Sequence, residues 1–360
     1  MQTGSALRLH LESLFPGASI VEVRPLGPDD AARDATTKAM GYGVPLRVTL
    51  RDPDGKEQRL VFRTASADEF GHDRRSDRAC SMLLDWDTFG KIPRHVPALD
   101  VGALHEDGRL TSLRQSGEFY LLTRYVEGHV YAEDLRRIAR EGRATPLDGE
   151  RALALAHYLA ELHRDGREDA IAQRRAARDL LGHGEGIFGV VDAYPDDVPC
   201  APPERLQVIE RLCLPWRWRL RSGPPHVWRT HGDFHPFNVV FTHDQEFTVL
   251  DTSRGSEGNS ADDVTCMAVN YLFFGLEAGS DGRRALAHLW RRFWHEYLEH
   301  GNAAVLHCAP PYLAWRGLVL ANPRFYPALP ARARDAILGL VERVLEEPTL
   351  DLDAAERILW

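Results

Sequence analysis

The segment Val227-Trp-Arg-Thr-His-Gly-Asp-Phe-His-Pro-Phe-Asn-Val-Val-Phe241, followed by Phe247-Thr-Val-Leu-Asp251, decides the fold of this chain. Two short apolar runs within it are rich in β-branched and aromatic residues, and the polar residues between them predict a hairpin. A hairpin places the residue before its first strand near the residue after its second strand. The sequence therefore predicts that Asn238 and Asp251 approach one metal ion.

The polar residues of this segment follow the order His-x-Asp-x-x-x-x-Asn, as His231, Asp233 and Asn238. This is the spacing of a kinase catalytic loop. Phosphoryl transfer needs a carboxylate that accepts the proton of the attacking hydroxyl, and oxygen ligands for the magnesium ions that neutralise the phosphates. The alternative is a buried hairpin in which these side chains only form Asx turns.

A metal hydrolase is a second alternative, because His231 and His235 are four residues apart in a histidine-rich run. Gly232 and Pro236 argue against a helix that would present both imidazoles to one ion. The phosphoryl-transfer interpretation is therefore preferred.

Three stretches resemble the aminoglycoside phosphotransferase and choline kinase-like family: Thr230–Asn238, Val249–Asp251 and Gly258–Val264. That family typically shows His-Gly-Asp-x-His-x-x-Asn, then an Ile-Asp pair, then Gly-Asp-Pro-x-x-Asp-Leu. The chain departs from the pattern after Asp251, where the family usually has an aromatic residue, and at 259–260, where Asn-Ser replaces Asp-Pro.

The resemblance implies a role for each matching residue. Asp233 would be the catalytic base, and Asn238 and Asp251 would be the magnesium ligands. His231 and Asp263 would brace the catalytic loop. The implied activity is ATP- and Mg²⁺-dependent transfer of a phosphoryl group to the hydroxyl of a small molecule.

The pattern of apolar residues predicts an α+β, bilobal protein-kinase-like fold, with a small β-rich N-terminal lobe and a larger helical C-terminal lobe. The boundary is expected at Val126, so that residues 1–126 form a nucleotide-binding lobe and residues 127–360 a catalytic and substrate-binding lobe. The predicted strands outside the hairpin are 19–25, 45–51, 59–64 and 119–126. The predicted helices are 5–15, 73–86, 153–163, 204–220, 262–274, 283–300, 311–320 and 331–346.

The nucleotide needs backbone N–H groups and a fixed cation around its phosphates. The segment 26–43, with Met40-Gly-Tyr-Gly43, is the candidate phosphate loop. Arg63 is the candidate cation and Asp77 the acid that would hold it. The family usually has Lys in place of Arg63, but this chain contains only three lysines among 44 basic residues. Adenine is expected against Leu121–Val126, so Tyr125 and Val126 are assigned to nucleotide binding, with GTP as an alternative to ATP.

The acceptor is expected on the helical side of the catalytic loop, where Glu185 and Asp262 are candidate ligands for an amine. A formal net charge of −9 agrees with a cationic acceptor. An aminoglycoside-like or other amine-bearing alcohol is one acceptor class, and a neutral sugar or amino alcohol is the alternative. A nucleotide-binding pseudokinase with a regulatory role is a further alternative, supported only by the irregular phosphate loop and by Arg63.

Composition excludes several other classes of protein. The negative net charge disfavours a nucleic-acid partner. Five scattered cysteines without Cys-x-x-Cys spacing indicate neither a zinc site nor a disulfide framework. No signal peptide or membrane-span-length apolar stretch is seen, so we expect a cytoplasmic protein without a membrane partner. The oligomeric state is not indicated by the sequence.

Overall fold

The computed structural model describes residues 2–26 and 45–359. The chain divides into two compact units, Met1–Thr123 and Arg124–Trp360, and each unit has its own hydrophobic core. The sequence places the boundary three residues later, at Val126. The candidate phosphate loop lies almost wholly at residues 27–44, outside the described residues.

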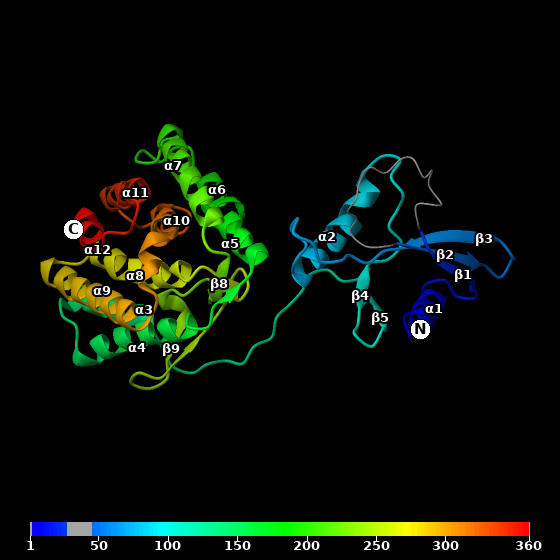
Figure 1. The fold of residues 1–360 in the computed structure, drawn as a ribbon, viewed down its shortest axis with the longest axis horizontal. Helices are drawn as coiled ribbons and strands as arrows, with labels where there is room; N and C mark the ends of the chain where they lie inside the picture. The colour runs from blue at the N-terminus through cyan, green and yellow to red at the C-terminus, as the bar shows by residue number, and fades with distance from the viewer. Residues whose placement is uncertain (1, 27–44, 360) are drawn as a thin grey trace. The chain divides into compact units, whose positions relative to one another are not determined.

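The first unit is built on a three-stranded antiparallel sheet in the order β1-β2-β3 (Figure 1). Leu7 and Leu11 lie one turn apart on the first helix, which makes one face apolar, and they share a core with Ile20, Val48 and Leu50 of the sheet. The elements of this unit are α1 (Gln2–Leu14), β1 (Ser19–Pro25), β2 (Leu46–Arg51), β3 (Glu57–Phe62), α2 (Arg75–Thr88), the 3-10 helix η1 (Phe89–Lys91), β4 (Gly102–Leu104) and β5 (Leu110–Ser112).

The second unit is mainly helical and carries two small antiparallel sheets, ordered β10-β9-β6 and β11-β8-β7. Its first half contains β6 (His129–Val130), α3 (Tyr131–Glu141), α4 (Pro146–Leu162), β7 (Arg167–Glu168), α5 (Ala170–Gly182), α6 (Ile187–Asp192), α7 (Pro203–Ser222) and β8 (His226–Arg229). Its second half contains η2 (Pro236–Asn238), β9 (Val239–Phe241), β10 (Phe247–Val249), β11 (Glu257–Gly258), α8 (Ala261–Gly275), α9 (Ser280–His300), η3 (Ala303–His307), α10 (Ala309–Ala321), α11 (Ala331–Glu346) and α12 (Leu352–Leu359).

Helix α8 is the centre of the second unit. Twelve of its fifteen residues are buried, and it packs against α9 and α10. Helix α9 buries Trp290, Phe293, Trp294 and Tyr297, which lie on one face at helical spacing. The segment 227–251 thus lies just before a densely packed helix in the chain.

The predicted α+β class, with a small sheet-containing unit followed by a larger helical one, is confirmed. The hairpin is also found where the sequence predicts it, as β9 and β10. Each predicted helix corresponds to an observed one, and 331–346 matches α11 in both bounds. The short helix α6 lies within 183–197, outside the predicted helices.

The predicted strand at 119–126 is wrong. This segment has no regular structure, and the side chains of Tyr120, Leu121, Leu122 and Tyr125 are 84% to 93% exposed. A strand requires a neighbour that pairs with its backbone, and no strand among residues 2–26 and 45–359 pairs with this segment. The local run of apolar and aromatic residues does not by itself supply that neighbour.

Helices long and apolar enough to cross a bilayer are absent from the part of the chain that the structure describes.

Candidate active site

The hairpin of β9 and β10 forms the frame of the candidate site. Val239 lies opposite Val249 in the register. One step further out, the Leu250 N–H donates to the Asn238 carbonyl at 2.8 Å. This hydrogen bond continues the ladder beyond the strands, so Asn238 and Asp251 flank the same end of the hairpin. The backbone thus places Leu250, the residue before Asp251, against Asn238, and the shared metal ion stays a prediction.

The carboxylate of Asp233 lies at the centre of a group of donors. Arg316 Nη1 donates to Oδ1 at 3.0 Å, and His235 Nε2 lies 3.3 Å from Oδ2. The Asn238 amide nitrogen donates to the Asp233 carbonyl at 3.1 Å and approaches Oδ2 at 3.4 Å. The Asp233 side chain remains 29% exposed, so these contacts orient it without closing it off from a substrate.

These donors also set the charge of Asp233. Burial on its own would raise the pKa of this carboxyl group. The hydrogen bond from His235 and the positive charges of Arg316 and Arg254 outweigh burial and hold the pKa well below its usual range. Asp233 is consequently an anion throughout the neutral pH range.

The oxygen atoms of Asn238 and Asp251 suit a magnesium ion. Because the Asn238 amide nitrogen faces Asp233, its Oδ1 is left as an acceptor. Neither this oxygen nor the exposed Asp251 carboxylate has a hydrogen bond or ion pair with any other described residue. Hard oxygen ligands of this kind, one of them charged, match the preference of Mg²⁺.

The turn before Asp233 depends on Gly232. Its φ is +82°, and a Cβ at this position would lie 2.1 Å from the Ser253 carbonyl oxygen. The close approach is fixed by the Ser253 N–H, which donates to the His231 carbonyl at 3.1 Å. Asp251 and Arg254 on the facing segment also have positive φ, of 51° and 56°. Strained non-glycine backbone of this kind is concentrated at functional sites.

A buried carboxylate braces this loop from below. Asp263 is fully buried and accepts hydrogen bonds from the backbone N–H groups of His231 at 2.8 Å and Gly232 at 2.7 Å. His163 Nε2 lies 3.2 Å from the same carboxylate, and His163 Nδ1 is 2.9 Å from the Tyr297 hydroxyl. Burial alone would raise the pKa of Asp263, but the hydrogen bonds from His163 and the two backbone groups lower it.

Arg316 joins the two carboxylates next to the loop. Besides Asp233, it donates through Nη2 to Asp262 Oδ1 at 2.7 Å and to the Gly232 carbonyl at 2.9 Å. Arg254 Nη2 approaches Asp262 from the other side, at 3.2 Å. Both guanidinium groups lie over the ring of Trp315, 3.9 Å and 4.4 Å from its centroid. Two arginines therefore neutralise Asp262 and share one aromatic platform.

Sequence reasoning missed both arginines. Arg316 is the single charged residue in α10, whose other residues are apolar. A lone charge in a buried helix requires a partner, and this signal was available in the sequence. Arg254 carries no comparable signal, because it lies in a polar loop. Its role depends on the packing of that loop on α10.

The two candidate acceptor residues differ in their surroundings. Asp262 already has two arginine partners, so an amine would have to compete with them, which the sequence did not predict. The Glu185 side chain is 64% exposed, 3.8 Å from Arg254 Nη1. Its carbonyl accepts a hydrogen bond from Trp315 Nε1 at 2.8 Å, which fixes the Glu185 backbone beside the catalytic loop.

The candidate nucleotide residues are distributed over both units. Arg63 is exposed, directly after β3. Asp77 lies in the first turn of α2 and accepts a hydrogen bond from the Arg74 backbone N–H at 2.9 Å. No ion pair joins Arg63 and Asp77 in the described structure. Tyr125 is exposed and Val126 half-buried, a few residues before β6, which pairs with β9 of the catalytic hairpin.

No protein-family model matches the chain, and no curated protein shows a significant match to it. Solved structures that are similar to it include a glucosamine kinase in complex with glucosamine, ADP and inorganic phosphate, at 17% identity and a TM-score of 0.39. A macrolide 2'-phosphotransferase type I is 16% identical with a TM-score of 0.33, covering 91% of this chain and 95% of that one. An ethanolamine kinase from Plasmodium vivax is 9% identical with a TM-score of 0.34, covering 97% and 83%.

All three are small-molecule kinases or phosphotransferases, the group that the catalytic-loop sequence resembles. The match to the glucosamine kinase complex covers 61% of this chain and 57% of that chain. At these identities and TM-scores the likeness identifies no substrate for this protein.

Proposed function

We propose that this protein is an ATP- and Mg²⁺-dependent O-phosphotransferase that acts on a small-molecule alcohol. One observation carries the proposal: an ionised, partly exposed Asp233 lies beside a hairpin end at which Asn238 and Asp251 offer oxygen ligands. A carboxylate base next to such a ligand pair is the set that phosphoryl transfer requires.

Each residue then has a defined task. Asp233 Oδ2 or Oδ1 accepts the hydroxyl proton of the acceptor and aligns its oxygen, while Arg316 and the Asn238 amide hold the carboxylate in one orientation. Asn238 Oδ1 and Asp251 would hold Mg²⁺, which when bound neutralises charge on the phosphates. Asp263 keeps the His231–Gly232 backbone in place. The chain's contribution is mainly positioning and electrostatics.

The nucleotide contacts remain predictions from the sequence. We assign Arg63 and Asp77 of the first unit, and Tyr125 and Val126 ahead of β6, to the binding of ATP. GTP is the alternative nucleotide.

The acceptor that we propose is an alcohol that also bears an amine. Around the loop, the carboxylates of Asp233, Asp251, Asp262 and Glu185 outnumber the guanidinium groups of Arg254 and Arg316, and the whole chain is acidic. An excess of negative charge raises the local concentration of a cation. With Asp262 neutralised by its arginines, the exposed Glu185 is the carboxylate best placed to meet the amine.

An acceptor panel tests this proposal. The full chain is incubated with ATP and Mg²⁺, and ADP formation is followed with amino sugars, aminoglycosides and amino alcohols, and with neutral sugars and alcohols of matched size. We expect turnover with amine-bearing acceptors, and an acceptor KM that rises with ionic strength because screening weakens the attraction. Turnover only with neutral acceptors would refute the proposal that the acceptor bears an amine. If no acceptor in the panel increased ADP formation, the proposed phosphotransferase activity itself would be refuted.

A further inference from the structure

Helices α4 and α9 bring together four side chains of metal-binding type, none of which takes part in the proposed reaction. His157 and Glu161 lie one turn apart on α4, and Glu296 and His300 lie one turn apart on α9. The two helices pack against each other, so a His–Glu pair at i, i+4 on one helix faces a Glu–His pair at i, i+4 on the other. Side chains four apart lie on the same helix face.

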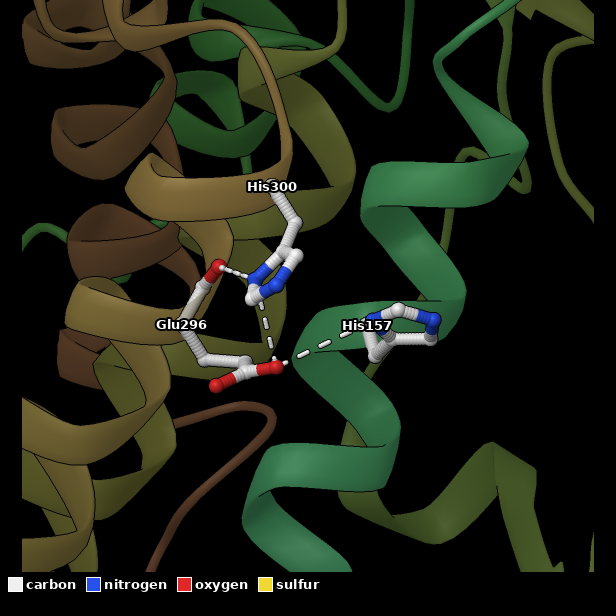
Figure 2. Close-up of side chains that lie close together, drawn as sticks. All are labelled: His157, Glu296 and His300. Carbon is white, nitrogen blue, oxygen red and sulfur yellow. Dashed lines mark hydrogen bonds and ion pairs between the residues drawn. The ribbon is translucent and has the colours of Figure 1, made fainter.

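The facing atoms have the separations of a coordination shell. Glu296 Oε1 is 3.3 Å from His300 Nδ1 and 3.7 Å from His157 Nδ1, and one ligand atom from each of the three residues falls within 4.8 Å of the others. Figure 2 shows both imidazoles turned toward this carboxylate oxygen. A tetrahedral ion with metal–ligand bonds of about 2.0–2.2 Å has ligands about 3.4 Å apart.

The second nitrogen of His157 supports the same interpretation. Its Nε2 lies 3.5 Å from Glu161 Oε1. A carboxylate at this position can accept a hydrogen bond from the Nε2–H group. The neutral imidazole then carries its lone pair on Nδ1, facing the metal, an arrangement common around metal-bound histidines. His300 Nδ1 now lies 3.2 Å from the Glu296 carbonyl. An ion would displace any proton on this nitrogen, because a ligand imidazole must be neutral.

The cluster is also accessible. The side chains of His157 and His300 are 47% and 42% exposed. His157, Glu161 and Glu296 line one side of a pocket of about 850 Å³, whose lining includes neither Asp233, Asn238 nor Asp251. Three protein ligands leave one position of a tetrahedral ion for water. Among the described residues, His157, Glu296 and His300 form the only group of three or more histidine, cysteine or acidic residues whose ligand atoms lie close enough to hold one ion.

We propose that His157, Glu296 and His300 form a binding site for a transition-metal ion of the zinc class, with Glu161 as a positioning residue. Two imidazoles and one carboxylate favour Zn²⁺, and by the usual affinity order Ni²⁺ and Cu²⁺, over Mg²⁺. The bound ion would link α4 to α9, because His157 lies on α4 and Glu296 and His300 lie on α9. This site is separate from the proposed magnesium site and does not depend on the proposed reaction.

Calorimetric titration of the full chain with ZnCl₂, in buffer containing millimolar MgCl₂, tests the site. We expect one Zn²⁺ to bind the wild type in the micromolar range, and His157→Ala and His300→Gln each to weaken binding at least about tenfold, as loss of a direct ligand should. His295→Ala is the matched control. His295 pairs with Glu299 one turn away on the same helix α9, at 3.5 Å, but the pair lacks an α4 histidine, so its Zn²⁺ affinity should stay within about twofold of wild type.

Two further measurements keep the result interpretable. Co²⁺ replaces Zn²⁺ in the same titration, and its spectrum should lack the thiolate charge-transfer band that binding at a free cysteine such as Cys80 would produce. Zn²⁺ should also raise the Tm of the wild type by several degrees at about 100 times its Kd, and leave the Tm of His300→Gln unchanged. His300 is exposed enough that this variant should fold.

Three outcomes would overturn the proposal: no Zn²⁺ binding by the wild type below millimolar concentration, a thiolate band with Co²⁺, or an equal loss of affinity in His295→Ala. Unaltered affinity in both His157→Ala and His300→Gln would do the same.

Discussion

Asp233, the proposed base, has a low pKa that depends on its neighbours. His235 and Arg316 favour its ionised form, and the Asn238 amide constrains its orientation. A carboxylate of low pKa is a weak base, so in the proposed reaction Asp233 would contribute by aligning the hydroxyl and by accepting its proton late in the transfer. Substitutions of Asp233 and of the residues that contact it therefore test the proposed reaction most directly.

Asp233→Asn removes the proton acceptor and retains the size of the side chain. We expect turnover to fall by about 10²–10⁴-fold, with ATP affinity within a factor of about three, because the role of Asp233 is not nucleotide contact. Steady-state ADP formation and calorimetry measure the two quantities. Asp244→Asn, which removes the same charge from the exposed hairpin turn, is the control. Near-native turnover in Asp233→Asn would remove this residue from the mechanism.

Arg316→Leu tests the charge balance of the site. Arg316 is 8% exposed, and its loss leaves Asp233 and Asp262 without a shared partner. Removing one partner of a buried ion pair lowers the free energy of unfolding by about 3–5 kcal/mol. Urea unfolding at pH 7 measures this loss. Arg324→Leu, at an exposed position, is the matched control, and its free energy of unfolding should stay close to that of the wild type.

The same variant has a predictable pH dependence. The pKa of Asp233 is lower in the folded protein than in the unfolded chain. Its ionised form therefore stabilises the fold above the unfolded pKa of about 3.9, and this contribution is lost as the pH falls through the lower, folded pKa. The stability deficit of Arg316→Leu should narrow below about pH 4, where protonated carboxyl groups no longer need the guanidinium. Parallel stability curves for wild type and variant would contradict this charge assignment.

At the scale of elements, the β9–β10 hairpin and the segment after it act as one unit. The hairpin ladder places Asn238 beside Leu250 and Asp251, and the next turn places Ser253 against Gly232. Helix α8 contributes Asp263, which holds the opposite side of the loop. The positions of the proposed base and ligands thus depend on three short backbone segments and not on any single contact.

Asp251→Ala should uncouple nucleotide binding from magnesium. Asp251 is the charged member of the proposed ligand pair, and its carboxylate has no partner among the residues described here. We expect Mg²⁺ to increase the ATP affinity of the wild type and to increase that of Asp251→Ala much less, in calorimetric titrations with and without Mg²⁺. The exposed Asp244→Ala in the same hairpin should behave as wild type. An equal effect of Mg²⁺ on both proteins would exclude Asp251 as a ligand.

Gly232→Ala should disturb the turn that carries Asp233. A non-glycine residue at φ +82° costs about 1–3 kcal/mol, and the new Cβ would press on the Ser253 carbonyl. We expect lower thermal stability together with a loss of turnover larger than any change in ATP affinity. Gly339→Ala in α11 is the control, since a Cβ there meets nothing within 4 Å, and it should stabilise the helix by about 0.5–1 kcal/mol. Gly232→Ala with unchanged Tm and turnover would refute the steric argument.

At the scale of the whole molecule, the chain consists of two units with separate cores. The core of the first is small, and its buried residues are Leu7, Leu11, Ile20, Val48 and Leu50. The core of the second is many times larger and lies entirely within 131–355. Since burial of apolar surface drives folding, the second unit has what it needs to fold by itself.

A fragment of residues 124–360 should therefore fold alone. We expect it to show a helical circular dichroism spectrum and a cooperative thermal transition. In the full chain, trypsin should cut first after the exposed Arg114 or Arg124, and Arg114→Gln with Arg124→Gln should slow this cleavage. A fragment without a cooperative transition, or first cuts inside the helices of the second unit, would show that the two units fold as one.

The sequence by itself determined the β9–β10 hairpin and most of the helices. Only the five residues 242–246 separate Val239–Phe241 from Phe247–Val249, so the ladder that joins Asn238 to Leu250 follows from local β preference and a short connection. Helices such as 331–346 follow from apolar residues at helical spacing, which a local pattern fully contains. The order of the sheet-containing and helical units can also be predicted from the sequence, because it follows from these local patterns.

Only the tertiary structure decided what surrounds that hairpin. Arg316 reaches Asp233 across 83 residues of sequence, and His157 meets Glu296 because α4 packs on α9. The apolar run at 119–126 has no pairing strand in the described structure, because a local run of residues cannot supply a neighbouring strand. Long-range partners are selected by how whole faces pack, and no local pattern of residues contains that information.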